Sequence, residues 1–431
     1  MMTTATWGNM RLRYVCKVNP NRGKKDYLPS DTEVSFVPME NIGEYGSLSL
    51  DKTKKIDEVS SGYTYFENHD VVFAKITPCF ENGKGAIADK LLNEIAFGST
   101  ELHVLRPYND IILSKFLYYL TISDYFRKNG ESFMYGAGGQ KRVPEDFVKD
   151  YVFRLLPISI QKVIIAYLDK ETARIDELIA KKERQIALHK EKRQAIITHA
   201  VTKGLDPKAK MVDSGVEWIG EIPERWEVKK MKYLGKAIIG LTYSPEDVVS
   251  DDDNIEKYLV LRSSNIQQGR LDLEDTVYVT KNIAKELSVQ KGDILICARN
   301  GSRNLVGKNA LIDHEFTNVT FGAFMTVFRS GINNYLCHYL SSSIFQYQAT
   351  GFLTTTINQL TKDILNNILV IVPPKEERSS LAFFLNAQKQ VYDEQEELIL
   401  KSILLLREYR SSLITSAVSG QIDITKMEAA G

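Results

Sequence analysis

Loops rich in amide, hydroxyl and basic side chains occur as one pair in each half of the sequence. Residues 75–85 and 135–142 form the first pair, and residues 299–309 and 354–359 form the second. Arginine and lysine can bind guanine or phosphate, and asparagine and glutamine can bind adenine through two hydrogen bonds. These loops are therefore candidates for nucleic-acid contacts, although a solvated turn contains the same residue types.

The first candidate loop of each half, at 75–85 and 299–309, follows a hydrophobic run that is typical of a strand. We expect a rigid strand to present the side chains of these loops as flexible donors, and we expect most of the 21 tyrosines and 18 phenylalanines to lie in the core. The candidate DNA-binding residues are Lys75, Thr77, Asn82, Lys84, Gln140, Lys141, Arg142, Arg299, Asn300, Ser302, Arg303, Lys308, Thr355, Asn358 and Gln359.

Catalytic and cofactor-binding motifs are missing from the sequence. The nearest approach to a phosphate-binding P-loop runs from Gly301 to Gly307-Lys308-Asn309, which has one residue too many and no hydroxyl at the last position. The sequence contains no HExxH, no G-x-S-x-G and no closely spaced cysteines and histidines that would bind a metal. We therefore expect a binding protein with no catalytic residues, no metal and no cofactor of its own.

The composition is typical of a soluble globular protein. Hydrophobic residues make up 43% of the 431 residues and charged residues 26%, which excludes disordered and fibrous classes. No run approaches the roughly 18 apolar residues of a membrane span, and the first residues do not resemble a secretory signal. We therefore expect a cytoplasmic protein that makes no membrane contact.

The charge balance, 55 basic against 55 acidic residues, argues against a nucleic-acid partner only if charge is evenly spread. It is not: residues 299–308 carry three basic and no acidic side chains, whereas residues 251–253 are all aspartate. The sequence thus predicts basic loops beside acidic surfaces. With so little excess positive charge, we expect the isolated chain to bind DNA weakly.

The sequence also repeats itself at a fixed offset of 217 residues. At this offset Asp176 aligns with Asp393, Arg193 with Arg410, and Ile197-Thr198 with Ile414-Thr415. With small changes in length the repeat extends backwards, for example from His69-Asp70-Val71 to Gly292-Asp293-Ile294 and from Asn41-Ile42 to Asn265-Ile266. Each half is therefore a variable globular region followed by a more similar helical region.

Local patterns predict mixed α/β structure in each globular region. Strands are expected at residues 71–74, 102–105, 294–298 and 325–328, and helices at 113–126 and 335–347. Residues 159–203 and 376–419 lack proline and glycine and have helical periodicity, which predicts two helices of equal length. An antiparallel pair would bury both apolar stripes, with Gly204 and Gly420 as C-terminal caps. The alternative is that each long helix packs on its own domain.

Two segments between and within these helices resemble type I restriction–modification specificity subunits. The segment from Asp213 to Val228 is DSGVEWIGEIPERWEV, and the segment from Ile196 to Asp206 is IITHAVTKGLD. The resemblance covers essentially the whole chain.

The resemblance implies an α+β fold with two globular α/β target-recognition domains separated by two long antiparallel helices, arranged as an internal repeat with pseudo-two-fold symmetry. It divides the sequence into recognition domains at 1–155 and 226–373, conserved helical spacers at 156–206 and 374–424, a linker at 207–225 and a tail at 425–431. Each recognition domain would bind one half of a bipartite, asymmetric double-stranded DNA sequence. The helix pair would set the gap between the halves.

The resemblance also implies partners. The helices would bind two methylation subunits, which carry S-adenosylmethionine, and restriction subunits would add an ATP- and Mg2+-dependent translocating nuclease.

Three alternatives to this interpretation of the function remain open. The chain could be a structural or assembly protein with two globular heads on a coiled coil, a diverged enzyme such as a stand-alone methyltransferase, or a two-headed transcriptional repressor.

Overall fold

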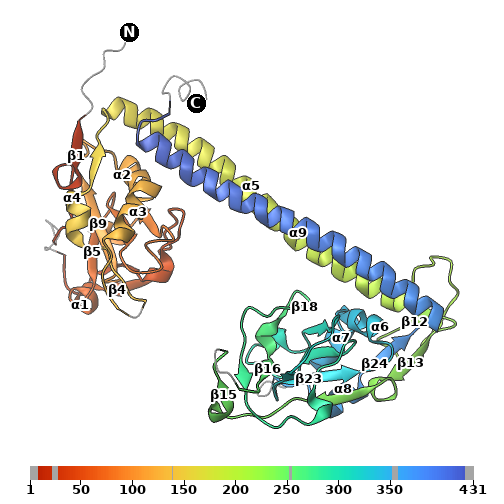
Figure 1. Ribbon diagram of the computed structural model, residues 1–431. Helices are drawn as coiled ribbons and strands as arrows, with labels where there is room; N and C mark the ends of the chain where they lie inside the picture. Colours follow the sequence, from red (N-terminus) through yellow and green to blue (C-terminus); the bar gives the residue numbers. More distant parts are fainter. Residues whose placement is uncertain (1–7, 22–27, 138, 252–254, 352–357, 423–431) are drawn as a thin grey trace. The chain divides into compact units, whose positions relative to one another are not determined.

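The computed structural model describes residues 8–21, 28–137, 139–251, 255–351 and 358–422. It divides into two compact units (Figure 1). Unit 1 comprises residues 1–182 and 400–431, and unit 2 comprises residues 183–399. Each unit therefore contains one globular α/β region together with parts of both long helices.

Unit 1 is built on two four-stranded sheets. One is wholly antiparallel, and the other contains a parallel pair between its two central strands, β3 and β8. In sheet order the strands are β2 (Cys16–Val18), β9 (Leu102–Pro107), β6 (Val71–Ala74) and β7 (Gly85–Ile87), and then β4 (Thr53–Lys55), β3 (Glu33–Val37), β8 (Ile95–Gly98) and β5 (Thr64–Glu67). Short helices complete the domain, namely α1 (Ile56–Val59), α2 (Ser114–Thr121), α3 (Asp124–Ser132) and α4 (Glu145–Asp150).

Unit 2 resembles unit 1, with one antiparallel sheet and one sheet that contains a parallel pair, β16 with β22, but this pair lies at the edge of its sheet and not in the centre. In sheet order the strands are β14 (Lys236–Ile239), β23 (Met325–Arg329), β20 (Ile294–Cys297) and β21 (Asn309–Leu311), and then β15 (Val248–Val249), β19 (Tyr278–Val279), β16 (Tyr258–Leu261) and β22 (Val319–Phe321). In both units a further antiparallel pair closes the domain, β1 (Asn9–Arg11) with β10 (Val152–Arg154) and β13 (Glu227–Lys230) with β24 (Leu369–Val372). The predicted repeat and the predicted strands are therefore confirmed.

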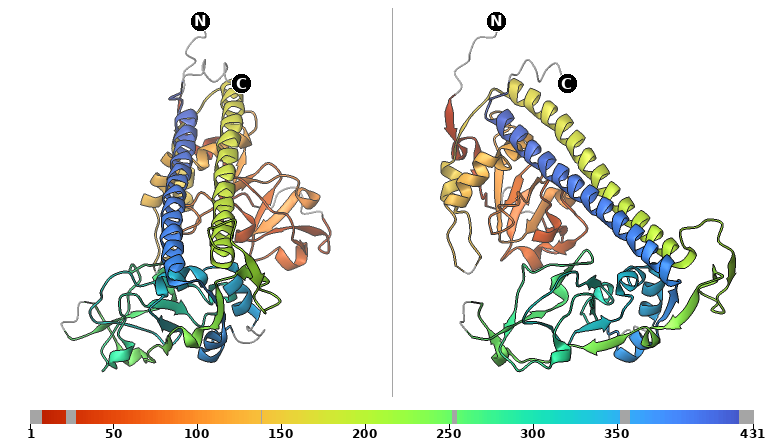
Figure 2. Two further views of the ribbon diagram at one scale, coloured as in Figure 1. Left: turned by 90° about the vertical axis from the view of Figure 1, so that its right-hand side faces the viewer. Right: turned by 45° about the vertical axis from the view of Figure 1, so that its right-hand side comes forward.

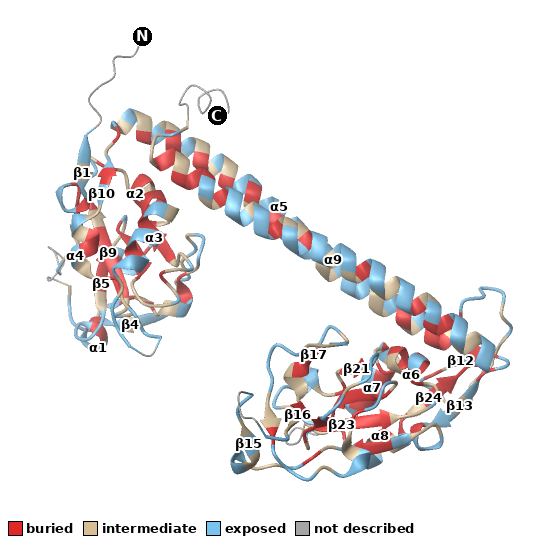
Figure 3. Cartoon of the chain, in the orientation of Figure 1, coloured by how far each residue is buried: buried red, intermediate tan, exposed pale blue. Residues whose placement is uncertain are grey.

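The strands β6 and β20 form the centre of each domain. All four residues of each strand are buried, and Figure 3 shows burial concentrated in these sheets. Phe73 packs edge-on against Phe126, with ring centroids 5.6 Å apart. Because these strands contact apolar side chains on both faces, they are continuous hydrophobic runs without alternation.

Each of the two shorter helices predicted from the sequence, at 113–126 and 335–347, is in fact two helices. Residues 113–126 form α2 and the start of α3, and residues 335–347 form most of α6 (Asn333–Tyr339) and the start of α7 (Ser343–Gly351). At each break a serine hydroxyl accepts a backbone hydrogen bond, Ser123 from Phe126 at 3.4 Å and Ser342 from Phe345 at 3.3 Å. The prediction of single helices was wrong because apolar periodicity continued across these N-terminal caps.

The two long helices are α5 (Ile158–Lys203) and α9 (Lys375–Val418), within one residue of their predicted ends. Gly204 and Gly420 follow them with φ of 81° and 71°, as expected for C-terminal caps. Within each unit the helices run side by side (Figure 2). The remaining α-helix of the described residues, α8 (Lys362–Asn367), precedes β24.

An ion pair between the helices occurs in each unit and follows the sequence repeat. In unit 1 Arg410 Nε lies 3.0 Å from Asp176, and in unit 2 Arg193 Nη1 lies 2.9 Å from Asp393. Arg193 aligns with Arg410 and Asp176 with Asp393, so the repeat contributes each partner once from each helix. Reciprocal pairs of this kind require the antiparallel arrangement that the sequence predicted.

The segment predicted as a linker contains a β-hairpin. Strands β11 (Met211–Asp213) and β12 (Glu221–Pro223) are antiparallel. The adjoining Trp226 is buried in the same apolar cluster as Val201 near the end of α5, and its indole nitrogen donates a 2.6 Å hydrogen bond to Glu377. This part of the chain is therefore a docked element of unit 2.

Candidate nucleic-acid interface

The two candidate loops of unit 1 lie together at the end of β6. The backbone N–H of Thr77 donates to the carbonyl of Lys141 at 2.9 Å, and the N–H of Val143 donates to the carbonyl of Lys75 at 2.8 Å. Between these bonds Ile76 pairs with Arg142 as an antiparallel bridge. A short backbone ladder thus holds side chains from both loops at one edge.

The same ladder occurs at the end of β20 in unit 2. The N–H of Leu360 donates to the carbonyl of Ala298 at 2.7 Å, the N–H of Asn300 donates to that of Asn358 at 3.4 Å, and Arg299 pairs with Gln359 between them. By position in the ladder, Arg299 corresponds to Ile76 and Gln359 to Arg142. The two units have the same backbone arrangement at this edge, and the side chains at corresponding positions differ.

Several candidate side chains bond within the protein, contrary to the expectation of flexible donors. Most of their partners lie far away in the sequence, and the sequence pattern does not reveal them. Thr77 donates to Glu81 (2.9 Å), Arg142 binds Glu101 through two bonds (2.9 Å each), Asn300 and Lys308 donate to Ser263 (3.1 Å each), Arg303 donates to the carbonyl of Thr350 (2.9 Å), and Asn358 donates to the carbonyl of Gly301 (3.2 Å).

The other candidates differ in exposure. Asn82, Gln140, Lys141, Arg299 and Ser302 are exposed, whereas Lys75, Lys84 and Gln359 are half-buried. Thr355 lies outside the described residues. The exposed members keep donors available for a ligand.

The sequence analysis did not identify two exposed aromatic residues beside the ladders, because it assigned the aromatic residues mainly to the core. Tyr135 is 66% exposed and exchanges backbone hydrogen bonds with Arg142. Phe324 is 59% exposed, and the Arg299 guanidinium lies 5.1 Å from its ring centroid. Such surfaces can stack on a base or a sugar. Only their exposure distinguishes them from core residues, and exposure depends on the tertiary fold.

Charge at the unit 1 edge is partly neutralised. A hydrogen bond from Arg142 lowers the pKa of Glu101, and the hydrogen bond to Glu101 raises the pKa of Arg142. At the unit 2 edge Arg299, Arg303 and Lys308 follow one another without an acidic residue between them. The second edge is therefore the more cationic along its first loop.

A buried histidine forms a hydrogen bond to the backbone of the unit 1 ladder. His103 Nε2 donates to the carbonyl of Val143 at 2.9 Å, and Nδ1 lies 3.1 Å from the amide nitrogen of Asn19. Burial lowers the pKa of His103 to about 4. The neutral ring is thus the form that holds the ladder strand.

Acidification is expected to weaken unit 1 through this histidine. In the unfolded chain the histidine has a pKa of about 6.5, whereas in the folded chain its pKa is about 4. Between these pH values the unfolded chain binds a proton that the folded chain does not. The free energy of unfolding therefore decreases as the pH falls from about 6.5 to about 4. Between pH 7 and pH 5 the free energy of unfolding should fall by about 2 kcal/mol. Urea unfolding at both pH values measures this, with His103→Gln as the comparison. An equal pH dependence in the two proteins would contradict the assignment.

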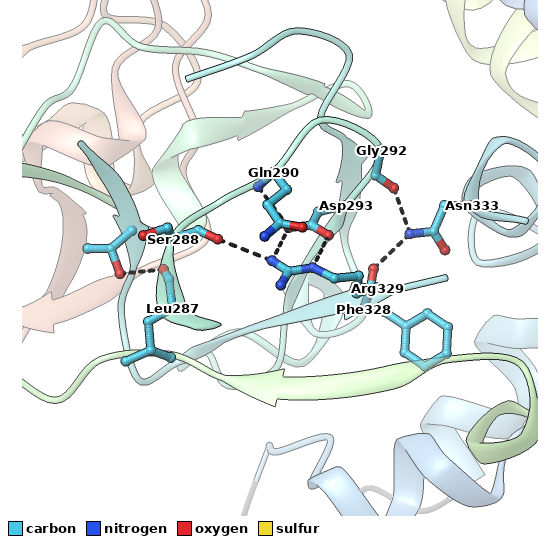
Figure 4. Close-up of polar contacts among 9 residues, drawn as sticks. Leu287, Ser288, Gln290, Gly292, Asp293, Phe328, Arg329 and Asn333 are labelled. Carbon is cyan, nitrogen blue, oxygen red and sulfur yellow. Dashed lines mark hydrogen bonds and ion pairs between the residues drawn. The ribbon is translucent and has the colours of Figure 1, made fainter. Parts of the chain in front are cut away.

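Paired acids and arginines fix the strands that carry the ladders. Arg329 binds Asp293 through bonds of 2.8 and 2.7 Å, just before β20 (Figure 4). Arg106 binds Asp70 through two bonds of 2.8 Å, just before β6. Burial raises the pKa of Asp70, and the bonds from Arg106 oppose that shift. Each pair therefore fixes the start of the strand that leads into a ladder.

Neither a membrane helix nor a metal cluster emerges from the described part of the chain. The helices there lack the combination of length and apolar character that crossing a bilayer requires. Across the same residues, no three histidine, cysteine, aspartate or glutamate side chains are placed together as metal ligands.

The fold and the paired edges define a class of protein: a tandem repeat of one α/β domain, with a long helix after each copy and different side chains on each edge. Residues 4–188 and 223–409 match the family model described as type I restriction modification DNA specificity domain. Since these two matches cover most of the sequence, the chain belongs to that family.

Individual relatives agree with this membership. The chain is 40% identical over 173 residues to the type I restriction enzyme EcoAI specificity subunit of Escherichia coli, and 35% identical over 173 residues to the EcoEI specificity subunit of the same species. Each match covers 40% of this chain and 29% of the relative, so less than a third of each relative is matched. A chain solved in a study of complex assembly and conformational transition of the type I R-M system shares the fold. Its TM-score is 0.71 at 17% identity, with 97% of this chain and 99% of that chain covered.

Proposed function

We propose that this chain is the DNA-recognition subunit of a type I restriction–modification complex, in which each α/β domain binds one half of a bipartite, asymmetric site. The observation that carries the proposal is the repeated ladder with different side chains. Ile76 and Arg142 occupy the positions in unit 1 that Arg299 and Gln359 occupy in unit 2. One backbone that presents two sets of side chains suits the recognition of two different half-sites.

The helix pair is proposed as the spacer between the two half-sites. The helices contain 46 and 44 residues, which at about 1.5 Å per residue gives a length of roughly 65–70 Å. That length corresponds to about 20 base pairs at about 3.4 Å each. The reciprocal ion pairs support a fixed register between the helices.

The chain is proposed to be non-catalytic and to act with methylation subunits that carry S-adenosylmethionine. Restriction subunits would contribute the ATP- and Mg2+-dependent steps. Large apolar side chains on α9 support a protein partner on the helices, since Phe383 is 78% exposed and Leu398 is 67% exposed in this chain. Weak DNA binding by the chain alone remains a prediction.

Replacing residues 1–155 with the equivalent domain of a relative is expected to change one half-site and leave the other unchanged. Methylome sequencing of cells that express the chimera with its methylation subunit measures both half-sites and the gap at once. The matched control is replacement of residues 226–373, which should change the other half-site. A change of both half-sites by one replacement would contradict modular recognition. Absence of any chain-dependent methylation would favour a purely structural protein.

Arg299→Ala is expected to weaken binding of the assembled complex to its own site by about 1–3 kcal/mol, because an exposed guanidinium at the ladder would lose contacts to a base edge. Competition between the cognate duplex and duplexes substituted at each position measures the effect. Lys236→Gln is the control, since Lys236 forms an exposed ion pair with Glu286 at 3.1 Å. An equal loss on all sequences would identify a phosphate contact instead.

A further inference from the structure

A hairpin that follows a buried asparagine occurs in both units. In unit 2 Asn265 donates to the carbonyls of Asp272 and Asp275 at 3.0 and 2.7 Å, and β17 (Ile266–Gln267) and β18 (Arg270–Leu271) follow it. In unit 1 Asn41 donates to the carbonyl of Ser49 at 3.1 Å, and Ile42 bridges to Leu48. We name residues 42–48 and 266–271 the coupling hairpins. Their internal bonds make each hairpin a rigid element.

The tip of each coupling hairpin contacts a long helix of its own unit. In unit 2 Arg270 Nη2 lies 2.6 Å from Asp393, and Lys389 Nζ donates to the carbonyl of Gly269 at 2.9 Å. In unit 1 the Arg410 guanidinium lies 4.6 Å from the ring centroid of Tyr45. Asp393 and Arg410 are both members of the reciprocal ion pairs between the helices. The hairpin tips are therefore bound at the points where the helix register is fixed.

The candidate DNA loop of each unit is contacted at the base of the hairpin, by the hairpin itself in unit 1 and by the turn that immediately precedes it in unit 2. Ser263, just before the unit 2 hairpin, accepts hydrogen bonds from Asn300 and Lys308, both candidate DNA-binding residues. In unit 1 the carbonyl of Gly43 accepts a 3.2 Å hydrogen bond from the N–H of Gly85, next to Lys84. The same pair of connections, helix to hairpin and hairpin to loop, thus occurs independently in both units.

We propose that the coupling hairpins position the DNA-binding loops relative to the helices, and that Arg270 and Tyr45 are positioning residues for sequence recognition. This inference rests on the proposed function. Its physical basis is that each loop is held to a helix through a short, hydrogen-bonded element with contacts at both ends. A change at the helix contact therefore alters the orientation of one loop without removing any of its donors.

The two helix contacts differ in chemistry. Arg270 is 60% exposed in its ion pair, so dissolved salt screens the attraction. The Arg410 side chain is only 8% exposed beneath Tyr45, where salt acts weakly. The unit 2 loop is therefore expected to depend on salt concentration more than the unit 1 loop.

The test uses the full chain, alone and in its complex with methylation subunits, and the variants Arg270→Gln and Tyr45→Leu. Arg270→Gln should reduce discrimination between cognate and substituted bases about fivefold at the half-site of unit 2 and leave the other half-site unchanged. Tyr45→Leu should reduce discrimination at the half-site of unit 1 and leave the half-site of unit 2 unchanged. Tyr45→Phe should retain the native discrimination because it keeps the aromatic face. Lys236→Gln is the control for loss of an exposed ion pair.

Hydrogen exchange on the isolated chain gives a readout that does not depend on DNA recognition. Arg270→Gln should speed amide exchange in residues 299–308 and not in residues 75–85, and high salt should mimic this variant in unit 2 alone. Unchanged exchange in 299–308, or equal loss of discrimination at both half-sites, would overturn the positioning role. If the native complex shows no sequence preference, the proposed function fails, while the exchange result still decides the coupling.

Discussion

Removal of seven residues from each long helix is expected to shorten the preferred gap between half-sites by about three base pairs. Residues 181–187 of α5 and 399–405 of α9 are suitable, since each segment lies between the two reciprocal ion pairs. Seven residues are close to two helical turns and about 10 Å, so the remaining side chains keep their faces. Because both helices lose the same number of residues, both ion pairs can still form.

The measurement is binding or methylation on a series of duplexes whose half-sites are separated by gaps that differ by one base pair. Deletion from one helix alone is the control, and it should abolish preference for any single gap because the two ion pairs no longer share a register. The spacer role would be wrong if the double deletion kept the original gap. It would also be wrong if the bases of the half-sites changed.

Asp293→Ala is expected to destabilise unit 2 by about 3–5 kcal/mol, because it leaves a partly buried guanidinium without its carboxylate. Asp293 is 1% exposed and accepts the two bonds from Arg329 together with one from the backbone of Gln290 at 2.9 Å (Figure 4). Arg329 would keep only its 3.1 Å bond to the carbonyl of Ser288. The start of β20, and hence the ladder at Arg299, would lose its fixed position.

Denaturant unfolding of the full chain, followed by a probe in unit 2, measures the loss. Lys236→Gln should change the stability by less than about 0.5 kcal/mol, as is usual for an exposed pair. Asp70→Ala in unit 1 should show a smaller loss confined to that unit, because Arg106 keeps its 2.9 Å ion pair with Glu67. A loss below about 1 kcal/mol for Asp293→Ala would show that the pair contributes little to the fold.

Much of the architecture was predictable because the relevant signals are local or repeated. Helical periodicity and the glycines at 204 and 420 gave the ends of α5 and α9 to within one residue. The fixed offset gave the duplication, and the structure then showed that the aligned arginines, Arg193 and Arg410, form the ion pairs between the helices. The four strands predicted from short hydrophobic runs all exist.

Other predictions failed where a single local contact overrode a pattern. Ser123 and Ser342 interrupt helices whose apolar periodicity continues. The sequence did not reveal that the 207–225 linker contains a hairpin, whose Ile222 belongs to the same buried cluster as Val201 of α5. The candidate loops at 75–85 and 299–309 follow strands β6 and β20, as predicted. Their side chains, however, were expected to be flexible, and Arg142 is held by Glu101.

The sequence by itself determined the duplication, the long helices and the family, because these depend on residue order over short spans and on long matching segments. The tertiary structure alone decided how each loop meets its partner, as when Ile76 pairs with Arg142 and Arg299 with Gln359. It also decided which donors stay exposed and how the coupling hairpins connect helix and loop. Such contacts join residues tens of positions apart, and no local pattern encodes their geometry, because it arises only when the sheets and helices pack together.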